Sequence, residues 1–306
     1  MDFKAQSVCI VLGPTGVGKT GIALRLALRL EGEVINCDSM QVYQGFDIGT
    51  DKLPEEQRKG VVHHLLDIVA PTHQFTAAEF AARASEAVAA IHARGRLPVI
   101  TGGTGLYLKA LLVGLFPEGR KDPEVRQKLD RETEDSGLET LRRRLEKIDP
   151  DYAAKIGSRD RIRIIRALEV QASTGRTMTE NFALTRPCLE NINIVKIGLQ
   201  CERSVLNAMI EDRVDRMFER GLVEETRRIL AGGVPEDAPP FRALGYRHVV
   251  RLIKKEITLE EAVALTKIDT RQYAKRQMTW FKKMEGIRWF SPQRFEEICE
   301  YVRQRI

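Results

Sequence analysis

A glycine-rich segment near the start of this 306-residue chain has the residue types that bind a phosphate. It consists of Gly13, Pro14, Thr15, Gly16, Val17, Gly18, Lys19 and Thr20, and it fits GxxxxGK[ST] at every fixed position. The glycines let backbone N–H groups turn toward a phosphate, Lys19 supplies a positive charge, and the Thr20 hydroxyl can ligate Mg²⁺. The segment therefore predicts a site for a di- or triphosphate together with Mg²⁺.

Two further side chains are candidates for chemistry at this phosphate site. Asp38 is a possible Mg²⁺ ligand, general base or helix N-cap, and its position alone favours the cap. Thr104 could cap a helix that begins near Leu106, or stabilise a bridging oxygen as charge develops on a leaving phosphate. The run from Thr101 to Gly105 holds no carboxylate. Motor-type ATPases need a second acidic Mg²⁺ ligand at such a strand end, so this absence argues against one.

The elements that must position these residues follow from the hydrophobic pattern. Short apolar runs predict strands at 7–12, 33–37 and 97–101, and helices are expected at 21–31 and 76–94. This alternation predicts an α/β fold, a P-loop NTPase-like core in which helices flank a parallel sheet. Ligands of such sheets bind at the carboxyl ends of the strands, where Gly13, Asp38 and Gly102 all fall.

Residues beyond 117 follow a different pattern. From 118 to 190 charged stretches carry apolar residues at helical spacing, which predicts an all-helical insertion domain between core segments 1–117 and 191–306. Strands are expected to resume at 192–199 and 287–290, with helices at 203–231 and 258–284. The second of these helices opens with Thr258 and Glu261 at capping-box spacing.

Composition narrows the function classes. No apolar run approaches the ~20 residues of a membrane-spanning helix, and the N-terminus does not resemble a signal peptide. The five cysteines form no CxxC pair, so we expect a cytoplasmic protein without a disulfide framework or zinc site. Residues 241–306 hold 15 basic and 8 acidic residues, net +7, within a total of +6. This excess fits either a solvated helix face or a surface for an anionic polymer.

Several motifs in fixed order resemble one known family. They are the phosphate loop, Asp38-Ser-Met-Gln-Val-Tyr43, Asp47-Ile-Gly-Thr50, His63-His-Leu-Leu-Asp-Ile68, Gly102-Gly-Thr-Gly-Leu-Tyr107, Asp160-Arg-Ile-Arg-Ile-Ile-Arg-Ala-Leu-Glu169, Gly245-Tyr-Arg247 and Thr270-Arg-Gln-Tyr-Ala-Lys-Arg-Gln-Met-Thr-Trp-Phe281. Together they resemble the bacterial tRNA dimethylallyltransferases, also called tRNA isopentenyltransferases. One departure is Asp51-Lys-Leu53, where that family usually has Ala-Lys-Pro. We expect it to leave the catalytic residues undisturbed.

The resemblance implies a prenyl transfer. The dimethylallyl group of dimethylallyl diphosphate would move to N6 of the adenosine beside the tRNA anticodon, adenosine-37, without nucleotide hydrolysis. Lys19, Mg²⁺ on Thr20 and, by similarity, Arg213 would neutralise charge on the departing diphosphate. Without the resemblance, Arg213 reads as a surface residue of a charged helix. Asp38 would accept a proton from N6 or orient it, and Thr104 would contact the bridging oxygen or the nucleotide.

The resemblance also implies a tRNA-binding surface for the anticodon stem-loop, from which the target base flips into the site. The residues expected to bind tRNA are Asp38, Ser39, Met40, Gln41, Thr104, Arg126, Arg163, Arg166, Arg242, Arg247, Lys275 and Arg276. Trp280 and Phe281 could stack on bases, although core packing is favoured. His63 and His64 are expected to be structural, because no further metal ligand lies nearby in sequence. Nothing in the sequence indicates an obligate oligomer, so a monomer is expected.

Three rival functions share the phosphate loop. A nucleotide kinase would leave the basic C-terminal residues and the arginine-rich segments unexplained. A prenyltransferase acting on free AMP would need neither those residues nor the helical insertion. A nucleic-acid-binding NTPase switch would need the second acid that is missing.

Overall fold

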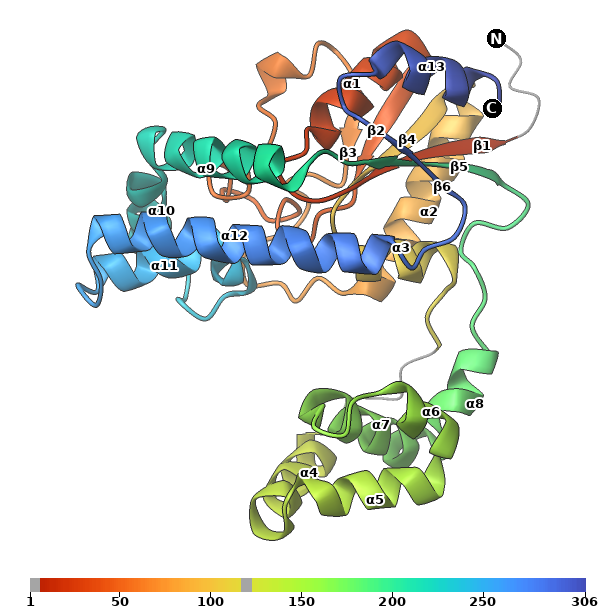
Figure 1. Ribbon diagram of the computed structural model, residues 1–306, viewed down its shortest axis with the longest axis vertical. Helices are drawn as coiled ribbons and strands as arrows, with labels where there is room; N and C mark the ends of the chain where they lie inside the picture. The colour runs from red at the N-terminus through yellow and green to blue at the C-terminus, as the bar shows by residue number, and fades with distance from the viewer. Residues whose placement is uncertain (1–5, 117–122) are drawn as a thin grey trace. The chain divides into compact units, whose positions relative to one another are not determined.

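The computed structural model describes residues 6–116 and 123–306, which form two compact units (Figure 1). Unit 1 comprises Met1–Leu111 and Leu189–Ile306, and unit 2 comprises Leu112–Cys188. The sequence predicts an inserted domain from 118 to 190, and the first of these bounds lies outside the described residues. The phosphate loop, Asp38, Thr104 and Arg213 all belong to unit 1.

Unit 1 is built on a parallel sheet of six strands among the described residues, as the strand–helix alternation predicted. The strands are β1 Ser7–Leu12, β2 Gly32–Asn36, β3 His63–His64, β4 Leu97–Gly102, β5 Asn193–Leu199 and β6 Ile287–Phe290. Their order across the sheet is β3-β2-β4-β1-β5-β6. Leu12 of β1 is in register with Gly102 of β4 and with Gly198 of β5. The loops that follow β1 and β4 therefore start side by side.

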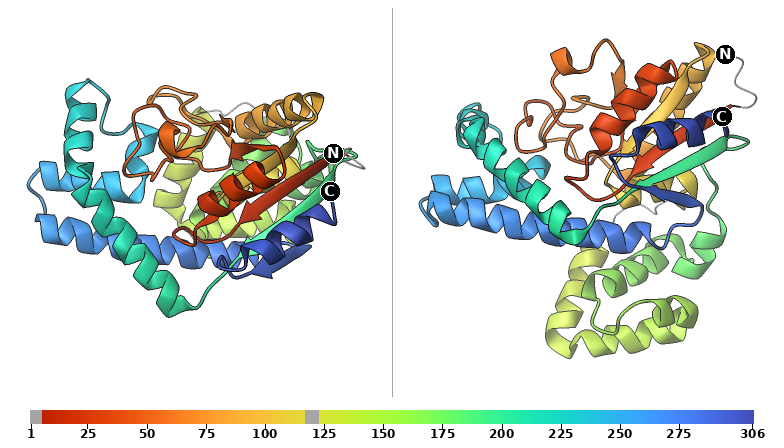
Figure 2. Two further views of the ribbon diagram at one scale, coloured as in Figure 1. Left: turned by 90° about the horizontal axis from the view of Figure 1, so that it is seen from above. Right: turned by 45° about the horizontal axis from the view of Figure 1, so that its top comes forward.

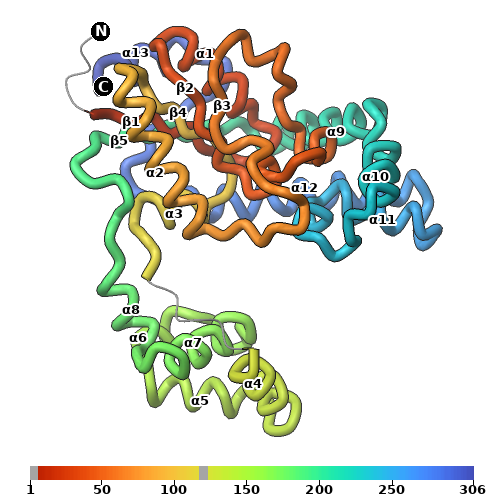
Figure 3. The backbone as a smooth tube through the Cα atoms, turned by 180° about the vertical axis from the view of Figure 1, so that it is seen from behind, coloured from red at the N-terminus to blue at the C-terminus, as the bar shows by residue number. Residues whose placement is uncertain are grey.

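Helices cover both faces of this sheet (Figures 1 and 3). The helices α1 Lys19–Arg29 and α13 Phe295–Arg303 lie on one face, and α2 Ala77–Ala93 and α3 Gly105–Leu112 lie on the other. Ile22 and Leu26 of α1 and Ile298 of α13 are buried in one cluster with the sheet. The resulting three-layer α/β core holds the start of α1 at the carboxyl end of β1.

The described part of unit 1 has four more α-helices, α9 Arg203–Glu219, α10 Leu222–Ala231, α11 Leu244–Ile253 and α12 Leu259–Phe281, and two 3-10 helices, η1 Glu55–Gln57 and η2 Pro239–Arg242. The prediction of one helix over 203–231 was wrong, because Gly221 has φ 92 and breaks it into α9 and α10. The predicted capping box of Thr258 and Glu261 is confirmed at the start of α12. Figure 2 shows α9 crossing α12, and the two helices are in contact.

The regular elements described in unit 2 are all helices. Its helices are α4 Pro123–Ser136, α5 Leu138–Ile148, α6 Pro150–Lys155, α7 Arg161–Thr174 and α8 Met178–Ala183. They bury a small core of their own that includes Leu129, Leu141, Leu145, Ile164 and Leu168. In the described parts of both units, no helix is long and apolar enough to cross a membrane.

Candidate active site

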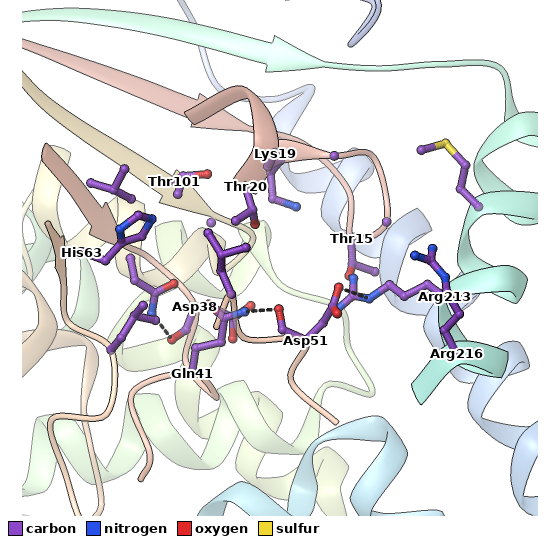
Figure 4. A pocket seen from close by; sticks show the side chains of 18 of the residues that line it. Thr15, Lys19, Thr20, Asp38, Gln41, Asp51, His63, Thr101, Arg213 and Arg216 are labelled. Carbon is purple, nitrogen blue, oxygen red and sulfur yellow. Dashed lines mark hydrogen bonds and ion pairs between the residues drawn. The ribbon is translucent and has the colours of Figure 1, made fainter. Parts of the chain in front are cut away.

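A cavity of about 390 Å³ lies at the carboxyl ends of the central strands (Figure 4). The phosphate loop, the segment after β2, the end of β4 and helix α9 all contribute to it. Its lining includes Thr15, Lys19, Thr20, Asp38, Gln41, Asp51, His63, Thr101, Met209, Arg213, Arg216 and Arg220. The expected convergence of the phosphate loop, Asp38 and Gly102 is therefore confirmed.

The phosphate loop has a backbone that only glycine accommodates at its first position. Gly13 has φ 149, and a Cβ there would lie 2.7 Å from the carbonyl oxygen of Leu199. Lys19 turns back along the loop, and its Nζ donates to the carbonyl oxygen of Pro14 at 2.8 Å. Burial, reinforced by the positive charge of Arg213, lowers the pKa of Lys19 to about 8. An anion bound beside Lys19 would replace the solvation that its ammonium group loses on burial, and would therefore favour the charged form.

Asp38 comes just after the end of β2 and directs its carboxylate into the cavity (Figure 4). Its Oδ1 accepts a hydrogen bond from the backbone N–H of Met40 at 2.9 Å. The side chain thus caps a turn, and the helix N-cap alternative is wrong because no helix begins here. Within residues 6–116 and 123–306, no donor bonds to the second carboxylate oxygen, which leaves it available to a substrate amine or a metal.

Thr104 lies next to Asp38 in space although it comes 66 residues later in the chain. Its backbone carbonyl accepts from Leu108 in the first turn of α3, whereas its hydroxyl accepts from the N–H of Ser39 at 3.0 Å. The hydroxyl therefore holds the turn that carries Asp38, and it does not cap α3 as one reading of the sequence had it. The Ser39–Thr104 bond joins the loops after β2 and β4.

Arg213 reaches the phosphate loop from α9. Its Nη1 donates to Oγ1 of Thr15 at 2.5 Å, and its Nε lies 3.0 Å from a carboxylate oxygen of Asp51. The interpretation of Arg213 as a plain surface residue was wrong. Its side chain lies at the phosphate loop, as the family resemblance implies. Asp51, where the sequence departs from the family pattern, therefore contacts a residue that is expected to neutralise the diphosphate.

Gln277 of α12 is a site residue that the sequence analysis missed. Its Oε1 accepts from the N–H of Thr15 at 2.7 Å, and its Nε2 donates to the carbonyl oxygen of Gly103 at 2.9 Å. One buried amide thus ties the phosphate loop to the loop after β4. A Cβ on Gly103 would lie 2.1 Å from Gln277 Nε2, so this contact requires glycine. The available signal was a polar residue on the same helical stripe as Ala274 and Phe281, which are both buried.

Apart from Asp38 and Thr104, the residues expected to bind tRNA in unit 1 fall into two sets. Ser39, Met40 and Gln41 form the turn after Asp38, and Gln41 lines the cavity. The remaining four, Arg242, Arg247, Lys275 and Arg276, are exposed. Arg247 is paired with Asp269. Lys275 and Arg276 line a shallow groove along α12 that also contains Gln272, Thr279, Trp280 and Lys283.

The three arginines expected to bind tRNA in unit 2 all have acidic partners. Arg163 pairs with Asp160 at 3.1 Å, and Arg126 and Arg166 both contact Glu169, at 3.5 and 3.4 Å. These arginines lie near one another on α4 and α7 of the same unit.

The sequence favours core packing for Trp280 and Phe281 and structural roles for His63 and His64, and the structure fits these expectations for only some of the four. Phe281 is fully buried, whereas Trp280 is half-buried and its ring packs on the backbone of Gly105. His64 pairs with buried Glu33 at 2.7 Å. His63 lines the cavity, and its Nδ1 lies 2.8 Å from the carbonyl oxygen of Val61. Among the described residues no group of three or more His, Cys, Asp or Glu is placed to hold a metal.

The donor set of the cavity suits Mg²⁺. The Thr20 hydroxyl and the Asp38 carboxylate both line it, and they are hard oxygen donors. Mg²⁺ is usually held by one or two protein oxygens together with substrate phosphates and water, so a cage of three carboxylates is not needed.

Comparison with known proteins gives one consistent result. A family model described as IPP transferase matches residues 41–284. The tRNA dimethylallyltransferase of Geobacter metallireducens is 45% identical over 302 residues, which cover 98% of each chain. That of Thermomicrobium roseum is 43% identical over 99% of this chain and 92% of the relative. The fold is similar to the tRNA isopentenylpyrophosphate transferase of Bacillus halodurans, with TM-score 0.73, 38% identity and coverage of 98% and 96%. It is also similar to a eukaryotic dimethylallyltransferase solved acting on tRNA, with TM-score 0.81, 29% identity and coverage of 97% and 77%.

Proposed function

Because this chain belongs to the IPP transferase family, we propose that it transfers a dimethylallyl group from dimethylallyl diphosphate to N6 of the tRNA adenosine 3′-adjacent to the anticodon, adenosine-37. The allylic C–O bond breaks, a C–N6 bond forms, and the products are N6-dimethylallyladenosine and diphosphate. One observation carries the proposal. The phosphate loop, a carboxylate and an arginine share one cavity, and the strand beside the loop ends without the acid of a motor ATPase.

The phosphate loop and Arg213 would bind the diphosphate and take up its charge as it leaves. Lys19 and Arg213 both point into the cavity, and the N-terminus of α1 adds its dipole. When bound at the Thr20 hydroxyl, Mg²⁺ would supply further neutralisation of the leaving diphosphate. Once the diphosphate is bound, these groups surround it before the C–O bond breaks, so they stabilise the charge that develops on it.

Asp38 would act on the attacking amine. Its carboxylate enters the same cavity as the phosphate loop, and one of its oxygens is fixed by the Met40 N–H. The other oxygen would accept an N6 proton, which orients the nitrogen lone pair toward the allylic carbon and removes the proton as the C–N bond forms. Thr104 would hold the Asp38 turn in place through its hydrogen bond to Ser39.

The basic groove on α12 would bind the anticodon loop. Lys275 and Arg276 are exposed there beside the half-buried ring of Trp280, a combination suited to phosphates and unstacked bases. The adenine must leave the stacked loop to reach Asp38 inside the protein. We place the enzyme in the cytoplasm as a monomer, with tRNA and dimethylallyl diphosphate as its substrates and Mg²⁺ as its cofactor.

A transfer assay with labelled dimethylallyl diphosphate and Mg²⁺ tests the reaction. Three acceptors are compared: an unmodified tRNA with adenosine-37, the same tRNA with guanosine there, and free AMP. We expect label only in the adenosine tRNA, with N6-dimethylallyladenosine identified after nuclease digestion. Label in AMP would favour a free-nucleotide prenyltransferase. ATP consumption without any transfer would favour a kinase or an NTPase.

A further inference from the structure

Asp51 places a negative charge in the wall of the diphosphate cavity. Its carboxylate lies 3.0 Å from Nε of Arg213 and 3.6 Å from Nη1 of Arg220. Both arginines line the same cavity as the phosphate loop, and Figure 4 shows Asp51 between the loop of Asp38 and Arg213. One acid thus contacts two of the cations that face a bound diphosphate.

The position of this carboxylate is built into the fold. Asp51 has φ 54, in the left-handed region, and its carbonyl oxygen accepts from Nε2 of Gln41. The next residue, Lys52, has a side chain only 4% exposed, and its Nζ donates to the carbonyl of Tyr43 at 2.9 Å and to Asp47 at 2.6 Å. The turn that presents Asp51 is therefore anchored on both sides.

The charge of Lys52 does not offset that of Asp51. Its Nζ is already paired with Asp47 and, at 2.5 Å, with Asp67. A diphosphate that enters the cavity therefore meets the field of Asp51 and must draw Arg213 and Arg220 away from it. Like charges repel, so Asp51 acts against the anion that its neighbours attract.

We propose that Asp51 is a competitor for the diphosphate that is built into the cavity. It holds Arg213 and Arg220 when the cavity is empty, and it pairs with them again as diphosphate leaves. The residue thereby lowers affinity for the donor and the product alike and favours product release. The proposal rests on the proposed function, because it takes diphosphate to be the ligand of this cavity.

The alternative is that Asp51 merely positions Arg213 for the diphosphate. The two roles predict opposite signs for the loss of the charge. If Asp51 competes, neutralising it strengthens diphosphate binding. If Asp51 positions Arg213, neutralising it weakens binding, because the arginine loses its support.

Isothermal titration of the full chain with inorganic diphosphate, with Mg²⁺ present, separates the two roles. The variant is Asp51→Asn, which keeps the shape of the side chain and tolerates the left-handed backbone. Its matched control is Glu56→Gln, which removes one charge from an exposed residue of the same loop that does not line the cavity. Asp51→Glu keeps the charge.

We expect Asp51→Asn to lower the dissociation constant about two- to fivefold, a size typical of a partly exposed ion pair. Glu56→Gln should leave the constant unchanged, and Asp51→Glu should stay close to the wild type. The inhibition constant of diphosphate in the transfer reaction should fall by the same factor as the dissociation constant. Unchanged or weaker binding in Asp51→Asn would overturn the proposal. A wild-type protein that binds no diphosphate would instead overturn the proposed function, and this inference with it.

Discussion

The cavity of unit 1 and the arginines of unit 2 are assembled in different ways. In unit 1, Arg213 bonds to Thr15 across 198 positions of sequence, and Gln277 bonds to Thr15 across 262. In unit 2, Arg163 pairs with Asp160 at i,i+3, as Arg166 does with Glu169. The cavity therefore depends on the tertiary fold, whereas the unit 2 pairs depend largely on single helices. We expect changes in the cavity to affect chemistry steeply and changes on unit 2 to affect binding gently.

The largest effect is expected from Lys19→Ala. It removes a positive charge that faces the leaving diphosphate, so kcat/KM should fall about 10³-fold or more. The tRNA dissociation constant should stay within about twofold, since the lysine lies in the phosphate loop. Initial rates and filter binding measure the two quantities, with exposed Lys59→Ala as control. A loss confined to tRNA binding would contradict the separation of roles.

A smaller loss is expected from Gln277→Ala, which cuts the bridge between the phosphate loop and Gly103. Misplacement of the loop should lower kcat/KM about 10- to 100-fold, mainly through the donor. Donor KM and kcat are measured at saturating tRNA, below the onset of thermal unfolding of the variant. A Gln277→Ala enzyme with normal kinetics would show that the bridge is not needed to position the loop.

The pH dependence of diphosphate binding should report Lys19. Its pKa of about 8 means that the empty protein loses this charge as pH rises through 8. Bound diphosphate raises that pKa, so binding takes up a proton and affinity falls up to about tenfold per pH unit above 8. Titration calorimetry in buffers of different ionisation enthalpy measures the uptake. Lys19→Ala should lose this component, and an identical profile in the variant would assign it to the ligand.

The smallest effect is expected from Arg163→Ala on unit 2. Loss of one exposed phosphate contact should weaken tRNA binding about two- to fivefold and reduce the slope of log K against log salt by about 0.7–0.9. At saturating tRNA, kcat should be unchanged. Binding measured from low to moderate salt tests this, with the exposed Arg143→Ala on α5 as control. A fall in kcat would mean that unit 2 takes part in the chemistry.

Much of the sheet was predictable because local sequence determines it. The runs at 7–12 and 287–290 are strands with those bounds, and the capping box begins α12 where predicted. The short β3 was missed, because two residues give no period to detect. The helix expected over 203–231 is divided at Gly221. An isolated glycine within a helical pattern does not always end the helix, so the sequence alone did not show that this one does.

The site was predictable where a motif is contiguous and not where it is tertiary. The phosphate loop is recognisable from its contiguous sequence pattern. Asp38 follows a predicted strand whose carboxyl end lies next to that loop. Gln277 and Asp51 belong to a helix and a turn, and neither sequence context indicates a cavity. Their roles come from partners far along the chain, which hydrophobic periodicity does not encode.

Asp38→Asn tests the central claim most directly, namely that the phosphate loop serves a transfer reaction activated by this carboxylate. Asparagine retains an oxygen for the Met40 N–H but accepts no proton from N6. Single-turnover transfer to adenosine-37 tRNA is measured together with the dissociation constants of tRNA and diphosphate. The account predicts a rate about 10²- to 10⁴-fold lower, with both constants within about threefold of the wild type. A rate close to that of the wild type would contradict it.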